Sequence, residues 1–369
     1  MAPFEKAVRL IKDTVESRRL PSAALGIGIG DTVCVKETFG ATSVTPEGIP
    51  VREDTLYDMA SVSKILSTSM IALRFIAEGI LDLADMLPRY FGQDAVPEDK
   101  KEISLFHLLT HTSGYPAHIP LYEKIPTPEL TVPYLLSVPL EHAPGTRVVY
   151  SCMGFILLGK MLERISGKTL DVLAREEVFS PLGMTRTGYH PLDAGTDYSA
   201  NTAYTERNPL TGEWLIGQVH DENARFLNGV SGNAGVFSNL NDSIRFARML
   251  AGHGVLDRKT YLPRRIFDVS IQNHTPGLEE NRGLGFQLAG GWHSCSGRFF
   301  PQSGFGHNGF TGPHIFVDPG SGLWTVLLLN RVHPTRENAE HLRVRRILHT
   351  LIAIGLEERS LPPEPLSPS

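Results

Sequence analysis

Cysteine is scarce in this sequence, and its three copies are widely spaced. Cys34, Cys152 and Cys295 are odd in number among 369 residues, and no two of them form a C-x-x-C pair. The pattern excludes a disulfide framework and contains no zinc motif. A chain of this length can bury a sizeable core without such cross-links, so we expect no metal ion and no cofactor.

A surplus of basic residues is also missing. The formal net charge is −5 at pH 7, so the sequence lacks the excess of basic residues that nucleic-acid-binding proteins carry. No uninterrupted apolar stretch reaches the roughly 18 residues of a membrane span. Residues 3–12 carry charges where a signal peptide needs an apolar run. We therefore expect a cytoplasmic protein without a membrane span, and the sequence does not indicate its oligomeric state.

Nucleotide-binding and α/β-hydrolase motifs are absent as well. There is no G-x-x-x-x-G-K-[ST] and no complete G-x-G-x-x-G, so nucleotide binding has no support. The nearest approach to G-x-S-x-G is 229–233, which ends in Asn233. His107 and His111 have the i, i+4 spacing with which one helix face can bind zinc, but no H-E-x-x-H glutamate lies between them. We predict no metal site.

Hydrophobic periodicity predicts an α+β fold. The N-terminal part favours a helix over 3–18 and a hairpin of strands over 23–29 and 32–39. A predicted helix over 61–78 is apolar nearly all round, which is typical of a helix buried at the centre of a protein. The other elements expected are helices at 104–110, 129–137, 153–165, 170–178, 242–251 and 336–354, strands at 285–289, 304–308, 314–317 and 323–330, and cleft loops over 190–235.

Strands at both chain ends, with helices between them, indicate an antiparallel sheet built from both ends and flanked by helices. A mostly helical region is inserted between these ends. We expect one domain over 1–360, with an α/β part at about 1–85 and 240–360 and a helical and loop part at about 86–239. The Pro-rich tail, 361–369, is expected to be disordered.

Ser61 and Lys64 form an S-x-x-K motif at the start of the predicted central helix. Positions i and i+3 share a helix face, so the Lys64 amine can reach the Ser61 hydroxyl. That hydroxyl needs a base, and a lysine serves as one only if its pKa falls, which apolar surroundings favour. The helix dipole would also stabilise negative charge at Ser61. Alone the motif is weak, because about one S-x-x-K is expected by chance in such a chain, and an N-cap serine beside a surface lysine is the plain alternative.

Two further segments carry groups suited to acyl transfer. Tyr150 lies on a connection after a Pro-Gly turn, where a neighbouring ammonium would lower its pKa and let it relay a proton to a leaving group. The Gly-rich segment 304–312 lies in the strand-rich C-terminal part, where exposed N–H groups can bind an acyl oxygen. Taken singly, each segment is also compatible with a half-buried aromatic residue or an ordinary turn.

In this order, the three elements resemble the penicillin-recognising serine enzymes. The chain is similar, over about 5–355, to the class C β-lactamase-like group, which includes D,D-peptidases, D-aminopeptidases and family VIII carboxylesterases. The stretches 108–114 and 229–238 also resemble that group. The resemblance implies a β-lactamase/transpeptidase-like fold and a small ester, amide or D-amino-acid peptide as substrate.

The same resemblance assigns roles to individual residues. Ser61 would be the nucleophile and Lys64 its partner, and Tyr150 would match the tyrosine of the Y-x-N element. The K-T-G element corresponds to His307, Asn308 and Gly309, which with Cys152 would bind substrate. The oxyanion hole would consist of the backbone N–H groups of Ser61 and Phe310. Whether Lys64 or Tyr150 is the acylation base stays open.

Two positions depart from the β-lactamase pattern. Cys152 replaces the asparagine of Y-x-N, so a weakly hydrogen-bonding thiol stands where an amide is usual. His307 replaces the lysine of K-T-G, and a histidine is mostly neutral at pH 7. Both changes weaken β-lactam recognition, so we predict an esterase or D-amino-acid peptidase or amidase with weak or no β-lactamase activity.

Other functions stay open at this point. A class C-like β-lactamase or a D,D-carboxypeptidase is the nearest alternative. A non-catalytic penicillin-binding sensor or scaffold could keep the fold and lose turnover, although the retained Ser61, Lys64 and Tyr150 argue against it. Cys152 could act as a thiol nucleophile, but no histidine partner is evident in the sequence, and a small packed cysteine is commoner.

Overall fold

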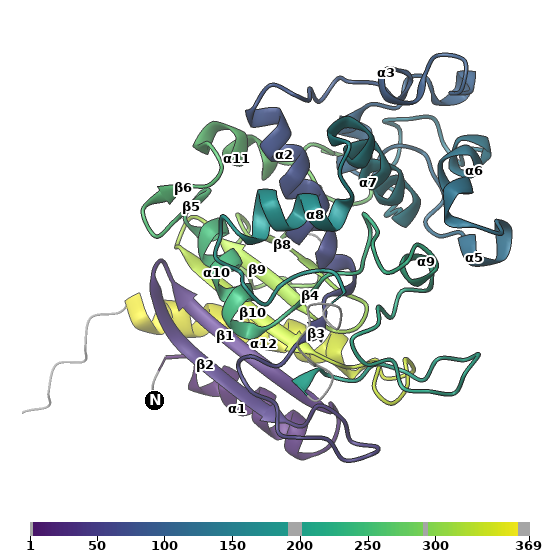
Figure 1. The fold of residues 1–369 in the computed structure, drawn as a ribbon. Coiled ribbons are helices and arrows are strands. Elements are labelled where there is room, and N and C mark those ends of the chain that lie inside the picture. Colours follow the sequence, from purple (N-terminus) through teal and green to yellow (C-terminus); the bar gives the residue numbers. More distant parts are fainter. Residues whose placement is uncertain (1–2, 191–200, 291–293, 361–369) are drawn as a thin grey trace, which may run out of the picture.

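The computed structural model describes residues 3–190, 201–290 and 294–360. Its centre is a six-stranded antiparallel sheet with the strand order β2-β1-β10-β9-β8-β7. The six strands are β1 Ser22–Ile29, β2 Thr32–Gly40, β7 Gln287–Leu288, β8 Phe305–Asn308, β9 His314–Asp318 and β10 Leu323–Leu329. The first two and the last four come from opposite ends of the chain, which confirms the predicted α+β fold (Figure 1).

Helices cover both faces of this sheet. Helices α1 (Glu5–Glu16) and α12 (Glu340–Ser360) pack against each other on one face, and α10 (Leu240–Ala251) lies on the other. The alternation of side chains along β9 shows the two layers: Phe316 belongs to the core beneath α1 and α12, whereas Ile315 and Val317 belong to the larger core. Burial on both faces explains why β10 is apolar at every position except Thr325.

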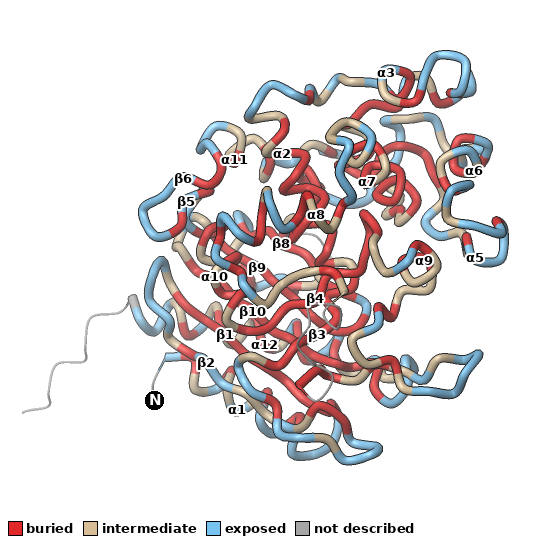
Figure 2. The backbone as a smooth tube through the Cα atoms, viewed as in Figure 1, coloured by how far each residue is buried: buried red, intermediate tan, exposed pale blue. Residues whose placement is uncertain are grey.

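The helix that follows Ser61 runs through the larger core. A 3-10 turn (Ala60–Val62) and a π-helical turn (Lys64–Thr68) lead into α2 (Ser69–Ala77). This stretch, Ala60–Ala77, is long and apolar enough to cross a membrane by length and composition, but 78% of it is buried inside the protein. Figure 2 shows α2 and α7 (Cys152–Ser166) as buried elements surrounded by exposed loops. The predicted all-apolar helix is therefore a core helix.

Smaller elements surround α2 and α7. The remaining helices are α3 Leu87–Phe91, α4 Leu105–Leu109, α5 Leu121–Lys124, α6 Thr131–Ser137, α8 Leu170–Ala174, α9 Glu222–Phe226 and α11 Arg264–Ser270. Four short strands form two pairs: β3 Tyr57–Asp58 with β4 Phe237–Ser238, and β5 Val255–Leu256 with β6 Lys259–Thr260. The β3–β4 pair matters for function, because it joins the segment before the nucleophile to the Gly-rich stretch 229–238.

A few boundaries differ from those predicted. Helix α12 begins at Glu340 instead of Arg336, whose backbone N–H is bonded to the Glu206 carboxylate at 2.7 Å. Strand β7 has two residues instead of five, because only Gln287 and Leu288 pair with β8. The expected disordered tail 361–369 and part of the expected loops, 191–200, lie outside the described residues. The division of one domain into two parts stays a prediction.

Candidate active site

Ser61 and Lys64 are brought together by one helical turn. The Lys64 Nζ atom lies 3.1 Å from Ser61 Oγ, as expected for positions i and i+3. Lys64 is completely buried, whereas Ser61 is partly exposed and lines a pocket of about 480 Å³. The predicted S-x-x-K pair therefore has the geometry for proton exchange at the floor of a pocket.

Three more groups surround the Lys64 ammonium. Its Nζ donates to the Asn233 carbonyl at 3.0 Å and lies 3.8 Å from Cys152 Sγ and 4.9 Å from the centre of the Tyr150 ring. The Asn233 carbonyl can come this close because Gly232 packs on α7, where a Cβ atom would lie only 2.0 Å from the backbone oxygen of Phe155. Gly232 is thus needed to bring the Asn233 carbonyl to Lys64.

The pKa of Lys64 departs from the predicted direction. Burial acts to lower this pKa, but the facing Cys152 and Tyr150 side chains outweigh burial, and the pKa is raised. The expectation that apolar surroundings would lower it is wrong, because the helix also delivers Lys64 to polar groups that stabilise the ammonium. In the resting site Lys64 is protonated.

Tyr150 lies on the connection before α7, as predicted, and its ring is enclosed by cationic and aromatic groups. The Arg282 guanidinium lies 5.2 Å from the ring centre, and the His111 and His307 rings lie at 4.6 and 5.8 Å. Burial raises the pKa of Tyr150, although Lys64 and Ser61 act against it. The predicted lowering is therefore wrong, since desolvation of the phenolate outweighs the neighbouring ammonium.

The hydroxyl of Tyr150 is buried and makes no hydrogen bond of good geometry within the described parts of the chain, although Lys64 and Ser61 lie close enough to act on its pKa. A buried polar group without a partner is costly in a folded protein and often marks a functional position. Here the group lies in the pocket that Ser61 also lines. The phenol is neutral in the resting site and free to bind a substrate atom.

Strand β8 brings His307 and Asn308 to the same pocket. Strand β7 pairs only with Phe305 and Gly306, so the outer edge of β8 is open at His307 and Asn308. The Asn308 Oδ1 and His307 Nε2 atoms are buried and without a partner among the described residues. Burial, together with Lys64, holds the pKa of His307 well below its usual range, so this ring is neutral, as the sequence predicted.

Gly309 allows the strand end to approach the nucleophile. A Cβ atom at Gly309 would lie 2.6 Å from the Met59 carbonyl oxygen and 3.3 Å from the Ala60 side chain. The Gly309 carbonyl accepts a bond from the Gly312 N–H at 3.1 Å, and this bond orients the peptide whose N–H belongs to Phe310. In a trans peptide the two groups point in opposite directions, so the Phe310 N–H is directed away from the turn.

Asp58 connects three segments beneath the nucleophile. Its two carboxylate oxygens accept separate backbone bonds, from Ala60 N–H at 2.8 Å and from His220 N–H at 2.6 Å. Its carbonyl accepts the Thr311 hydroxyl at 2.7 Å. Burial raises the pKa of Asp58, while the two N–H donors act against burial. Ala60, which precedes Ser61, has a φ of 44°, a conformation that costs energy for a residue with a side chain and that the bond to Asp58 helps to hold.

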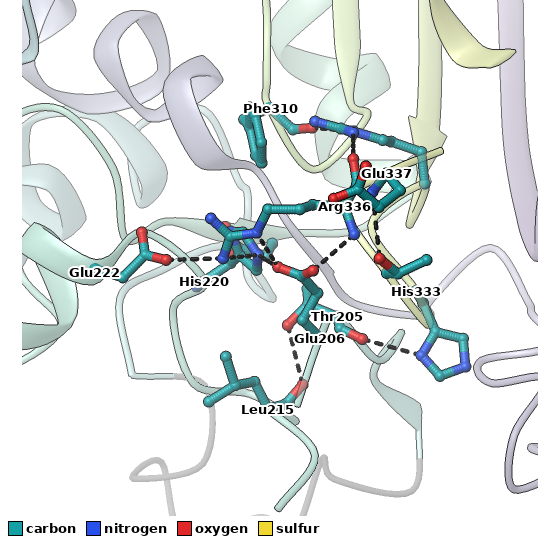
Figure 3. A network of polar contacts seen from close by, with 12 residues as sticks. Thr205, Glu206, Leu215, His220, Glu222, Phe310, His333, Arg336 and Glu337 are labelled. Carbon is teal, nitrogen blue, oxygen red and sulfur yellow. Dashed lines mark hydrogen bonds and ion pairs between the residues drawn. The ribbon is translucent and has the colours of Figure 1, made fainter. Parts of the chain in front are cut away.

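A network of ion pairs forms one side of the pocket (Figure 3). The Arg336 guanidinium binds Glu206 at 2.5 Å and Glu222 at 2.8 Å, and Glu206 also accepts from His220 Nε2 at 2.7 Å. The His220 ring stacks on Phe310 with centres 5.7 Å apart. The network joins the loop around Glu206, the start of α9 and the segment after β10, and it supports Phe310 at the mouth of the site.

Several residues of the site were not identified from the sequence. Asp58 is three residues before Ser61, and a single acidic residue within the apolar run around it was the available signal. Arg282 and Asp221 lie in polar segments that resemble ordinary loops, and no local pattern marks them. The pocket lining also includes His118, Glu222, Glu280, Gln287 and Arg336.

The histidine pair considered for zinc does not share a helix face. Helix α4 ends at Leu109, and His111 lies beyond it with a φ of 58°. His107 Nδ1 is within 3.3 Å of the Ser104 hydroxyl, while His111 Nδ1 accepts from the Ser151 N–H at 3.1 Å. Each of the two histidine rings therefore makes its own hydrogen bond within the fold, and the two rings are not arranged to bind one zinc ion. As for Cys152, burial raises the pKa of its thiol, which disfavours the thiolate that a nucleophilic cysteine needs.

Comparison with known proteins gives the family. The family model described as Beta-lactamase matches residues 7–350. A Bacillus subtilis protein named N-acetylmuramyl-L-alanine amidase is 31% identical over 313 residues, covering 76% of this chain and 68% of the relative. An Escherichia coli O157:H7 protein named as a D-alanyl-D-alanine carboxypeptidase is 31% identical over 308 residues, covering 76% and 70%.

The fold is shared with solved structures of lower identity. Unliganded simvastatin synthase (LovD) from Aspergillus terreus superposes with a TM-score of 0.74 at 22% identity, covering 97% of this chain and 99% of that one. At this identity the likeness concerns the fold alone. With the family model matched over nearly the whole chain, the protein belongs to the beta-lactamase family and is a serine hydrolase.

Proposed function

We propose that this protein is an esterase or D-amino-acid peptidase or amidase that forms an acyl-enzyme on Ser61. The observation that supports this most directly is the buried Lys64 ammonium 3.1 Å from Ser61 Oγ, next to a Tyr150 hydroxyl without a partner among the described residues. A serine, a cation and a neutral proton carrier in one pocket are the groups that acyl transfer needs.

The proton states suggest how the acylation step proceeds. Lys64 is an ammonium and Tyr150 a neutral phenol, because both pKa values are raised. As Ser61 Oγ forms its bond to the acyl carbon, its proton passes to Tyr150 Oη, and in the same step the Tyr150 proton passes to the leaving-group atom, so Tyr150 stays neutral. The acyl bond then breaks as the tetrahedral intermediate collapses and releases the protonated leaving group. Lys64 stabilises the negative charge that develops on both oxygens. Water then repeats the relay in reverse and releases the acid.

The oxyanion of the tetrahedral intermediate would bind the backbone N–H groups of Ser61 and Phe310. Gly309 packs against the Met59 carbonyl, which puts the strand end beside the start of the nucleophile helix. Ala60 at positive φ turns the chain between Met59 and Ser61. Two donors held by backbone packing need no rearrangement during the reaction, which is the basis of their catalytic effect.

One observation favours a second candidate, a D,D-carboxypeptidase. Arg282 is 1% exposed and lines the pocket, and its Nε and Nη1 atoms have no partner within the described residues, although Nη2 binds Glu280. Two free guanidinium donors suit a substrate carboxylate. Arg282 could therefore supply the positive charge that neutral His307 lacks. β-Lactam turnover is expected to be weak, because Cys152 lacks the amide of the usual asparagine.

The proposed function is tested with p-nitrophenyl butyrate, comparing wild type with Ser61→Ala. Wild type should turn over and the variant should fall to background, and intact-mass measurement should find one butyryl group on wild type only. Ser69→Ala is the matched control: Ser69 Oγ lies on the same helix and is buried without a partner in the described chain, so its loss breaks no hydrogen bond.

Equal rates for wild type and Ser61→Ala would remove Ser61 as the nucleophile. If neither hydrolyses the ester, D-alanyl-D-alanine peptides are assayed in the same pair of proteins. Ser61-dependent release of D-alanine would then favour the carboxypeptidase, and Arg282→Leu should raise KM for the free carboxylate more than for the C-terminal amide. No Ser61-dependent turnover of any of these substrates would favour the non-catalytic binding protein.

A further inference from the structure

Asp221 occupies a fixed position at the edge of the active-site pocket. It follows His220, whose N–H is held by Asp58 beneath the nucleophile. Its Oδ1 atom accepts the Ala224 N–H at 2.8 Å and caps α9, which leaves the second oxygen without a bond in the described chain. Asp221 lines the pocket together with Ser61 and is only partly buried, so this carboxylate can contact a bound substrate.

The charge of Asp221 is not neutralised by a neighbouring cation. The adjacent Glu222 is paired with Arg336 at 2.8 Å, whereas Asp221 has no ion pair within the described segments. Its negative charge acts on the reacting groups: it helps to raise the pKa values of Lys64 and Cys152. Asp221 is thus an unpaired carboxylate near the nucleophile.

The opposite charge is found elsewhere in the same pocket. The Arg282 guanidinium is nearly fully buried, with two nitrogen atoms unpartnered among the described residues. Its charge helps to lower the pKa values of His111 and His307, whereas Asp221 acts on Lys64 and Cys152. Arg282 lies 5.2 Å from the centre of the Tyr150 ring, whereas Asp221 lies at the start of α9. The two charges therefore belong to different parts of the pocket lining, and a ligand that satisfies both must carry a cationic group and an anionic group.

We propose that Asp221 is a specificity residue that binds a substrate ammonium group, so the preferred substrates are amino-acid amides or short peptides with a free amine. The inference rests on the proposed Ser61 acyl-enzyme and adds the substrate class. An α-amino group with a pKa near 8 is mostly cationic at pH 6.5, and one partly buried carboxylate is enough to bind it. A metal ion would need more ligands, and the described residues contain no group of three that could hold one.

The test is the kcat/KM ratio for D-alanine p-nitroanilide over N-acetyl-D-alanine p-nitroanilide at pH 6.5. The two substrates differ in the charge of the amine. Wild type should prefer the free amine by at least about tenfold, which corresponds to one ion pair of about 1.4 kcal/mol. In Asp221→Asn the ratio should fall about tenfold, mainly through KM. Glu123→Gln is the control, because Glu123 is an exposed acid on α5, which packs against α9 outside the pocket.

The outcomes separate the two proposals. Ser61-dependent hydrolysis with the same ratio in wild type and Asp221→Asn overturns the ammonium site and leaves the acyl-enzyme intact. A wild-type preference for the acetylated substrate does the same. A fall in the ratio that Glu123→Gln reproduces would assign the effect to general charge and also overturn it. If neither anilide is hydrolysed faster by wild type than by Ser61→Ala, the proposed peptidase activity is overturned, and so is the proposed substrate class.

Discussion

Asp58 helps to hold the position of Ser61, the proposed nucleophile, through its bond with the Ala60 N–H. In the wild type, the carboxylate oxygens of Asp58 accept the N–H groups of Ala60 and His220 at 2.8 and 2.6 Å. In Asp58→Asn one of these oxygens becomes an NH2 group, so one of the two backbone N–H groups would face a donor and lose its acceptor. A buried N–H left without an acceptor costs about 2–3 kcal/mol when the lost acceptor was charged. The free energy of unfolding should fall by that amount.

This loss of unfolding free energy can be converted into a change in melting temperature, Tm. The unfolding entropy is about 2.1 cal/mol/K per residue, and the chain has 369 residues. A loss of about 2–3 kcal/mol should therefore lower Tm by about 3–4 °C. Most of the protein remains folded at assay temperature, so activity can be measured separately from stability.

The effect on activity should be larger than the effect on stability. Where the amide NH2 faces Ala60, the Ala60 N–H loses its acceptor, so Ala60 can leave its strained conformation at φ 44°, and Ser61 moves with it. A displacement of the nucleophile of about 1 Å reduces the rate about a hundredfold. We expect kcat for p-nitrophenyl butyrate to fall by about that factor, with KM changing less, and Tm to be measured by calorimetry on the same samples.

Asp242→Asn is the control for loss of a buried carboxylate charge. Asp242 is buried, and burial raises its pKa as it does for Asp58. The backbone N–H of Arg186 and the hydroxyl of Thr187 both donate to the same carboxylate oxygen of Asp242, so an asparagine can retain both bonds. Asp242 does not line the pocket. A kcat for Asp58→Asn within about twofold of this control would refute the positioning role, and an unchanged Tm would refute the hydrogen-bond argument.

Three further results are expected. Gly309→Ala should reduce kcat at least about tenfold, because the new Cβ atom would lie 2.6 Å from the Met59 carbonyl oxygen, close to Ser61. Gly320→Ala is the control and should leave kcat unchanged, because its Cβ atom would make only ordinary van der Waals contacts. Since the pKa values of Lys64 and Tyr150 are both raised, kcat/KM for p-nitrophenyl butyrate, which has no ionising group of its own in this range, should stay level from pH 7 to 9. An inflection with this ester would contradict these proton states. Although burial opposes them, hydrogen bonds from His220 and Arg336 lower the pKa of Glu206 to about 2. The stabilising effect of Glu206 is complete above about pH 4.5 and should be lost as pH falls to about 2, so urea unfolding should show a smaller loss of stability in acid for Glu206→Gln.

Much of the fold could be predicted from the sequence, because its signals are local. The apolar positions of α1 repeat within a few residues, and β1 and β2 are two short strand-forming runs joined at Gly30 and Asp31. The start of α12 was predicted four residues early, since Arg336 has helix-forming neighbours but is bound to Glu206, far away in the chain. The hydrophobic periodicity of a segment carries no information about a partner that is distant in the chain. The cytoplasmic location stays a prediction from the charged N-terminal residues.

The site was predicted in outline, and its electrostatics were not. Ser61, Lys64, Tyr150 and His307 do meet in one region of the fold, as their order in the chain suggested, while their catalytic roles stay predictions. Both expected pKa decreases were wrong. The direction of each shift depends on the balance between burial and nearby groups, and that balance is a property of three-dimensional distances.

By itself, the sequence determined which residues could carry acyl-transfer chemistry, because the spacing of Ser61 and Lys64 on a helix fixes their distance. It also determined that both chain ends form one sheet, since strand signals lie only there. The tertiary structure alone decided that Asp58, Asp221 and Arg282 belong to the site. These residues are far apart in the chain and carry ordinary local patterns, so only the packing of distant segments places their charges around one nucleophile.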